Sequence, residues 1–254
     1  MRLFITSYQK SGTHQSYPMF MPECPSIVDR SGMGNKGMDD WGFPSGIYPR
    51  PKMSETCDVL RTFNKHGRDH VRAFGHVAYL PEYAEAVQTA STKVVFNVRD
   101  PRDVIIAEIA HIKKFEREGR ISHAWLNYKR ESDDKRINEI ADPITEMIMI
   151  AAAKWKNWIG WLDHDFVTRL QFEELRLRPL ETANWLTEQL KPVVLPKSPP
   201  QMVEAAAAGR KPGSLTPSFR KGKVGEWKSL FKAHHKKLAY ELMGEIIERL
   251  GYEI

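Results

Sequence analysis

Three short segments of the sequence combine basic side chains with glycine or with the start of a helix, and this combination binds anions. The first is Lys10-Ser11-Gly12-Thr13, which follows the apolar residues 2–6. If a strand runs into this turn and a helix follows it, backbone N–H groups and the positive end of the helix meet at one point, and Lys10 adds a charge. The segment is no Walker A loop, because the lysine precedes the glycine. On its own it is equally compatible with a polar surface turn.

The second segment is centred on Arg99. It follows the run KVVFNV at 93–98, which is typical of a strand, and it precedes Asp100-Pro101, which is typical of a helix start. Open α/β sheets bind their ligands at such strand ends. Arg99 is therefore a candidate anion ligand, and an ion pair with Asp103 is the alternative interpretation.

The third segment, Arg220-Lys221-Gly222, lies in the most basic part of the chain. Lys and Arg exceed Asp and Glu by 38 − 32 = +6, whereas residues 201–240 alone hold nine Lys or Arg against two Glu, which is +7. A flexible loop of this kind can hold a phosphate with an arginine fork and a lysine point charge. We therefore expect an anionic partner near 201–240. A solvated basic loop or a nucleic-acid-binding patch is also compatible with this segment.

Strand signals alternate with helix signals along the chain. Strands are predicted at 2–6, 71–74, 93–98 and 166–172. Helices are predicted from Pro101 to about Gly119, from Pro143 through Trp155, Trp158 and Trp161, and near 180–190, 201–209 and 234–249. This order predicts an α/β fold with a mainly parallel central sheet flanked by helices, in a single domain over residues 1–254. Residues 17–54 are predicted to be a long irregular loop. Pro18 is expected to limit any helix that follows the Lys10–Thr13 segment.

The composition excludes several classes of protein. With 41% hydrophobic and 28% charged residues, the chain is typical of a globular protein and not of a disordered one. Cys24 and Cys57 are too few for a disulfide scaffold or a four-cysteine zinc site. No segment is typical of a signal peptide or a membrane span, so we expect a cytoplasmic protein without a membrane partner.

Taken together, the three segments resemble the sulfotransferase family that uses 3′-phosphoadenosine 5′-phosphosulfate (PAPS). QKSGTH at 9–14 is similar to its loop for the 5′-phosphosulfate, and VRDPRD at 98–103 to its strand and helix start for the 3′-phosphate. FRKGKVGEWK at 219–228 resembles its RKGxxGDWK signature, and GHVAYLP at 75–81 its THLP segment. The resemblance implies a P-loop-like fold and transfer of a sulfuryl group from PAPS to a hydroxyl or amine of a small-molecule or glycan acceptor.

The resemblance also implies roles for individual residues. Lys10 would stabilise the charge that develops on the leaving phosphate oxygen, and His76 would be the base that removes the acceptor proton. The ligands of the 5′-phosphate would be Lys10, Ser11, Gly12, Thr13 and His14, and those of the 3′-phosphate Arg99, Arg220, Lys221 and Gly222. The product nucleotide would be 3′-phosphoadenosine 5′-phosphate (PAP), and neither a metal ion nor a nucleic-acid partner is expected.

The sequence also departs from the family pattern. Ala107 stands where the family usually has a serine ligand of the 3′-phosphate, Gln15 replaces a tryptophan that flanks the adenine, and Phe172 replaces a tyrosine. Residues 203–209 also differ from the family's base-binding segment. These departures leave open a protein that binds PAP or PAPS without turnover. A P-loop nucleotide kinase or phosphotransferase is the other alternative, and the missing GK[ST] pattern argues against it.

Overall fold

The computed structural model describes residues 2–20, 72–75, 78–89, 92–119, 137, 140–208 and 222–254. The chain divides into two compact units. The first contains the chain up to Val98 together with Gly160–Phe219, and the second contains Arg99–Ile159 together with Arg220–Ile254. The organisation of residues 1–254 as a single domain stays a prediction.

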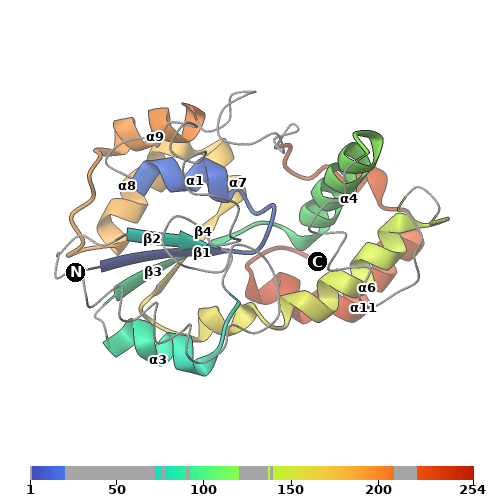
Figure 1. The fold of residues 1–254 in the computed structure, drawn as a ribbon, viewed down its shortest axis with the longest axis horizontal. Helices are drawn as coiled ribbons and strands as arrows, with labels where there is room; N and C mark the ends of the chain where they lie inside the picture. The colour runs from blue at the N-terminus through green and yellow to red at the C-terminus, as the bar shows by residue number, and fades with distance from the viewer. Residues whose placement is uncertain are drawn as a thin grey trace. The chain divides into compact units, whose positions relative to one another are not determined.

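The described part of the first unit contains a four-stranded sheet in which all neighbouring strands are parallel (Figure 1). Its strands are β1 (Arg2–Ser7), β2 (Arg72–Gly75), β3 (Thr92–Val98) and β4 (Val167–Gln171), in the order β2-β1-β3-β4. Ser7 lies opposite Asn97, and Val98 lies opposite Gln171. The carboxyl ends of β1, β3 and β4 therefore share one edge of the sheet, and the predicted parallel α/β fold is confirmed.

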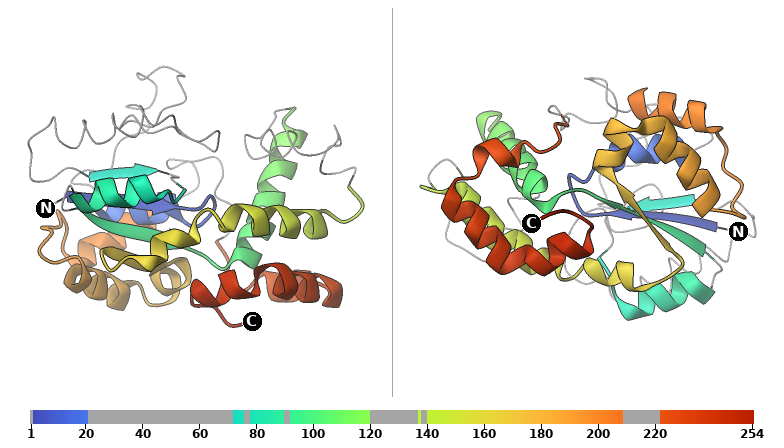
Figure 2. Two further views of the ribbon diagram at one scale, coloured as in Figure 1. Left: turned by 90° about the horizontal axis from the view of Figure 1, so that it is seen from below. Right: turned by 180° about the vertical axis from the view of Figure 1, so that it is seen from behind.

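Helices cover both faces of this sheet. On one face lie α1 (Thr13–Phe20), α8 (Pro179–Gln189) and α9 (Pro199–Ala208), and on the other lies α3 (Pro81–Thr89), as Figures 1 and 2 show. The short helix α7 (Phe172–Leu177) follows β4 directly. Because successive strand residues point to opposite faces, Leu3 and Ile5 join the core beneath α1, whereas the ring of Phe4 lies 6.0 Å from that of Trp161.

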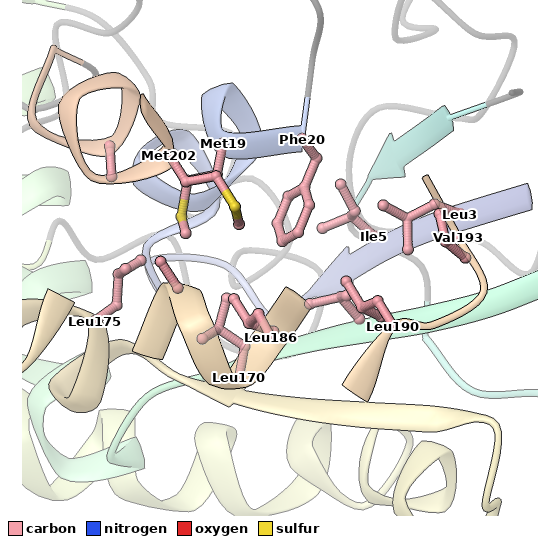
Figure 3. Close-up of a cluster of buried hydrophobic side chains, with 13 residues drawn as sticks. Leu3, Ile5, Met19, Phe20, Leu170, Leu175, Leu186, Leu190, Val193 and Met202 are labelled. Carbon is pink, nitrogen blue, oxygen red and sulfur yellow. The ribbon is translucent and has the colours of Figure 1, made fainter. Parts of the chain in front are cut away.

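The core of the first unit fills the layer between the sheet and helices α1, α8 and α9 (Figure 3). It is built from aliphatic and methionine side chains of β1, β3 and β4, of α1, α7, α8 and α9 and of the segment that follows α8, with one aromatic ring. Its buried members are Leu3, Ile5, Met19, Phe20, Val95, Leu170, Leu175, Ala183, Leu186, Leu190, Val193, Met202 and Ala206. The core thereby fixes α1 against β1, and with it the loop that joins them.

The described part of the second unit is helical. It contains α4 (Pro101–Arg117), α6 (Pro143–Trp155), α10 (Trp227–Leu230) and α11 (Ala233–Arg249), and α6 packs against both α4 and α11. The two predicted helix starts are confirmed. Asp100 accepts a hydrogen bond from the N–H of Arg102 at 2.9 Å, and Asp142 accepts one from the N–H of Thr145 at 3.3 Å.

The tryptophan-rich segment differs from the prediction. The helix from Pro143 ends at Trp155, whereas Trp158 lies in a turn and Trp161 in the 3₁₀-helix Ile159–Asp163. Within this 3₁₀-helix, the ring of Tyr79 lies where a Cβ of Gly160 would be, so this close approach requires glycine. All three tryptophans are buried.

Two other predictions, about where a helix and a strand end, are corrected. Residues Tyr17–Phe20, predicted as the start of the long loop, form the end of α1 despite Pro18. Tyr17, Met19 and Phe20 are all buried, and burying each contributes about 1.5–3 kcal/mol, which offsets the roughly 3 kcal/mol cost of an interior proline. The strand predicted to include Phe172 ends at Gln171. Among the described residues, no helix has the length and apolar character that crossing a membrane requires.

Candidate functional site

The loop between β1 and α1 makes a tight turn at the carboxyl edge of the sheet. Lys10 has φ of 60° and Gly12 has φ of 88°, both in the left-handed region. The carbonyl of Gly12 accepts hydrogen bonds from the N–H groups of Gln15 at 2.8 Å and Ser16 at 3.1 Å, so the helix begins immediately after the glycine. The first N–H groups of a helix have no acceptor within the helix, so this loop presents donors to an anion.

Gly12 also lies against an aromatic ring. A Cβ at this position would meet the ring of Phe172, the first residue of α7, which is itself buried. The positive φ and the close contact both require glycine here. The end of β4 thereby supports the loop that leaves β1.

Several buried polar atoms around this loop have no hydrogen-bond partner in the described part of the chain. They are Ser11 Oγ, the amide oxygen and nitrogen of Gln15, and Asn97 Oδ1. Gln15 is only 4% exposed. Leaving a buried polar group unpaired costs about 1–3 kcal/mol, and a polar ligand would remove that cost. The Asn97 amide nitrogen donates to Ser16 Oγ at 3.0 Å and so links β3 to α1.

In the second unit, the start of α4 holds the segment that follows Gly222. Arg99, 5% exposed, directly follows β3 and donates from Nη2 to the carbonyl oxygen of Lys223 at 2.9 Å. Asp103 accepts from the N–H of Gly225 at 2.6 Å and from the N–H of Trp227 at 3.0 Å. Arg99 and the first turn of α4 therefore fix three backbone positions of a segment more than 120 residues further along the chain.

Asp103 is a buried carboxyl group, and burial raises its pKa above the usual value. The N–H of Trp227, the positive charge of Arg99 and the N–H of Gly225 act in the opposite direction and favour the charged form. The pKa of Asp103 is raised overall, so keeping this carboxylate ionised costs free energy that its hydrogen bonds only partly offset.

Arg102 completes the same arrangement. Its guanidinium lies 3.7 Å from the centre of the Trp227 ring, which is a cation–π contact. It also donates to both carboxylate oxygens of Asp100 at 2.9 Å and to the carbonyl oxygen of Glu253 at 2.6 Å. These contacts of Arg102 and Asp103 were not predicted from the sequence, in which the repeated Arg-Asp pair of VRDPRD was the available signal.

Comparison with known proteins identifies the fold. No protein-family model and no curated protein matches the sequence. Among solved structures, the mouse sulfotransferase SULT7A1 complexed with PAP matches with a TM-score of 0.55 and 17% identity over 98% of this chain and 87% of that one. This chain has the sulfotransferase fold. Retinol dehydratase in complex with androsterone and the inactive cofactor PAP matches with a TM-score of 0.53 and 13% identity, over 100% of this chain and 82% of that one.

On this sulfotransferase fold, the predicted residues fall into two groups. Lys10, Ser11 and Gly12 lie in the β1–α1 loop of the first unit, and the backbones of Thr13 and His14 form the first turn of α1. Arg99 and Gly222, which has φ of 55°, belong to the second unit. The remaining predicted residues, His76, Arg220 and Lys221, lie outside the described residues.

A further polar cluster ties two helices of the second unit together. Asp142 lies 2.9 Å from His235 Nε2 and 3.1 Å from His234 Nε2, an arrangement that could also hold a metal ion. However, His235 Nδ1 accepts the N–H of Lys232 at 3.1 Å, so its proton is on Nε2 and points to Asp142. A metal ion on Nε2 would need the opposite tautomer. The cluster is therefore better explained as a hydrogen-bonded link between α6 and α11.

Proposed function

We propose that this protein is a PAPS-dependent sulfotransferase. The observation that carries the proposal is the β1–loop–α1 unit of a sulfotransferase fold, in which Lys10 and Gly12 adopt positive φ. Buried polar atoms beside this loop have no hydrogen-bond partner among the described residues. A loop of this shape suits a tetrahedral anion. The Ser11 hydroxyl and the Gln15 amide, which have no partner in the described part of the chain, are further groups that a nucleotide could engage.

In the proposed reaction the acceptor oxygen or nitrogen attacks the sulfur of PAPS in line with the bond that breaks. A new bond forms from the acceptor to sulfur, the bond between sulfur and the 5′-phosphate oxygen breaks, and PAP leaves. His76 takes the proton from the acceptor, because imidazole titrates near neutral pH. Lys10 stabilises the negative charge on the leaving oxygen, an interaction that is strongest in the transition state.

The 3′-phosphate is assigned to the second unit. Arg99, Arg220, Lys221 and Gly222 would bind it, and the contact of Arg99 with the carbonyl of Lys223 supports this grouping. The acceptor is proposed to be a small molecule or a glycan with a hydroxyl or amine. Retinol dehydratase forms complexes with androsterone and with retinol, which are small molecules of this kind.

The test is thermal unfolding with PAP, with AMP and with ATP–magnesium, followed by transfer from PAPS to a panel of hydroxyl and amine acceptors. A saturating ligand at a hundredfold over Kd adds about 2.7 kcal/mol, which is several degrees of Tm for a chain of this size. A shift with PAP alone supports the proposal. A shift with ATP–magnesium alone would favour a phosphotransferase and contradict it.

A second candidate function is PAP or PAPS binding without turnover. Ala107 in α4 and Gln15 in α1 favour it, because they depart from the family at positions that contact the nucleotide. A Tm shift with PAP combined with no transfer to any acceptor of the panel would support this second function over the first.

A further inference from the structure

The segment 222–227 is attached to the first turn of α4 through its backbone. The carbonyl of Lys223 accepts from Arg99 at 2.9 Å, and the N–H groups of Gly225 and Trp227 donate to Asp103 at 2.6 and 3.0 Å. Every second residue is attached, namely Lys223, Gly225 and Trp227, so the residues between them have little conformational freedom. Both carboxylate oxygens of Asp103 are used, one for each N–H group.

A carboxylate is the side chain that this arrangement requires. It accepts hydrogen bonds at both oxygens, whereas the amide of an asparagine has one acceptor and would direct its NH₂ group at a second donor. Charge-assisted bonds to backbone N–H groups are also shorter and stronger than neutral ones. Asp103 is 1% exposed, so water cannot easily replace a bond that is lost.

The side chain of Trp227 is held from the same turn of helix. Its ring stacks on the guanidinium of Arg102, which is itself fixed by Asp100 and by the carbonyl of Glu253. The backbone bonds from Asp103 and this stack act on the same residue. The conformation of 222–227 is therefore fixed in large part by Arg99 and by the first turn of α4.

We infer that Asp103 is a positioning residue for recognition of the 3′-phosphate. This inference rests on the proposed function, in which Arg220, Lys221 and Gly222 bind that phosphate together with Arg99. Asp103 fixes the backbone at Gly225 and Trp227, which lie three and five positions after Gly222 in the chain. Through Lys223, the same segment also receives a hydrogen bond from Arg99. Asp103 itself need not touch the nucleotide.

Burial of this carboxylate supports the inference. Because a buried charge costs free energy, ionic groups in such places are weak contributors to stability, and burial raises the pKa of Asp103. Retaining a carboxylate here is more easily explained by the geometry that it imposes on 222–227 than by a gain in stability.

The test compares Asp103→Asn with Asp142→Asn. Asp142 is the matched control, because it is also an aspartate at the start of a helix of the second unit but contacts His234, His235 and Thr145 instead of 222–227. We expect Asp103→Asn to weaken PAP binding about tenfold or more, which is the effect of losing one charge-assisted hydrogen bond, and to change AMP binding less than twofold. Asp142→Asn should leave the ratio of the two affinities unchanged.

A second variant changes Gly225, whose N–H group donates a hydrogen bond to Asp103. Gly225 has φ of 72°, and a Cβ there would have its nearest contact 3.8 Å away, on the side chain of Lys228. Gly225→Ala therefore strains the turn without a clash, and it should lower PAP affinity but not AMP affinity even if Asp103→Asn fails to fold. The inference is overturned if the ratio of PAP affinity to AMP affinity is unchanged in a folded Asp103→Asn protein. If Asp103→Asn does not fold, an unchanged ratio in Gly225→Ala overturns it. If the unaltered protein binds PAP no better than AMP, the proposed function itself fails.

Discussion

Lys10 holds a backbone conformation that side chains disfavour. Its φ of 60° costs about 1–2 kcal/mol for a residue with a Cβ, and glycine would avoid that cost. Strain of this kind is typical of functional sites, where the position of the side chain outweighs the loss of stability. We interpret the lysine at this position as a residue kept for its charge.

This interpretation predicts different effects for two replacements of Lys10. Lys10→Ala and Lys10→Gly should both lower kcat by a factor on the order of 10²–10³, while PAP affinity falls much less. Lys10→Gly should also raise the free energy of unfolding by about 1 kcal/mol relative to Lys10→Ala. Steady-state kinetics and urea unfolding measure the two effects. Equal losses of kcat and PAP affinity would argue against a role in the transition state.

A second prediction about a single residue concerns the side-chain amide of Gln15. Gln15→Leu keeps the volume and removes an amide that has no partner among the described residues, so the free protein should gain about 1 kcal/mol of unfolding free energy. If the amide contacts the nucleotide, PAP affinity should fall at the same time. Gln189→Leu, at an exposed position of α8, is the control and should change neither. A Gln15→Leu protein that binds PAP normally would exclude the amide as a ligand.

Local sequence patterns correctly predicted the strand that precedes Lys10 and Gly12. The helix that follows them extends to Phe20, further than the sequence led us to expect. The roles of Arg102 and Asp103 depend on partners 151 and 122–124 positions away. No local pattern encodes such contacts. The unpaired state of Gln15 likewise follows from packing and not from its neighbours in sequence.

At the scale of elements, Asp142 links the start of α6 to the start of α11. Burial would raise the pKa of this carboxyl group, but hydrogen bonds with His235, His234 and Thr145 hold it well below its usual range. A group with a lowered pKa stabilises the folded state above its unfolded pKa, and this contribution is lost as the pH falls. The link should therefore weaken in acid.

Asp142→Asn tests this dependence. Asparagine still caps a helix, so the variant removes mainly the charge. We expect the unaltered protein to be more stable than the variant by about 1 kcal/mol near neutral pH, because the group is partly exposed. The difference should shrink below about pH 5 as the unfolded chain, with a pKa of about 3.9, takes up its proton. A difference in Tm that stays constant from pH 7 to pH 3 would show that the charge is not responsible.

Sequence patterns predicted the long elements better than the short ones. The helices α4 and α6 begin at Asp-Pro pairs, and both starts were correct. In contrast, α7 has six residues and α10 has four, and neither was predicted. A helix this short is marginal by itself and is stabilised by packing. For α10, that packing is the contact with α4, which sequence spacing does not reveal.

At the scale of the molecule, the predicted ligands of the two phosphates come from distant parts of the chain, Lys10–His14 for one and Arg99 and Gly222 for the other. PAP, which carries both phosphates, should slow amide hydrogen exchange in peptides that contain either group of residues. AMP, which lacks the 3′-phosphate, should protect mainly the peptides that contain Lys10–His14. Equal protection of the Arg99 and Gly222 peptides by AMP would contradict the assignment of the 3′-phosphate.

The strand order also has a consequence for the newly made chain. β1 lies between β2 and β3, yet 91 residues separate the end of β1 at Ser7 from the end of β3 at Val98. At about 5–20 residues per second, a ribosome needs roughly 5–20 s to complete that neighbour. During this time the apolar Leu3, Phe4 and Ile5 lack the partner on their β3 edge, which exposes them to chaperones and to aggregation. Of the described strands, β1 is made before the others, but it can pair on both sides only after β3 has emerged.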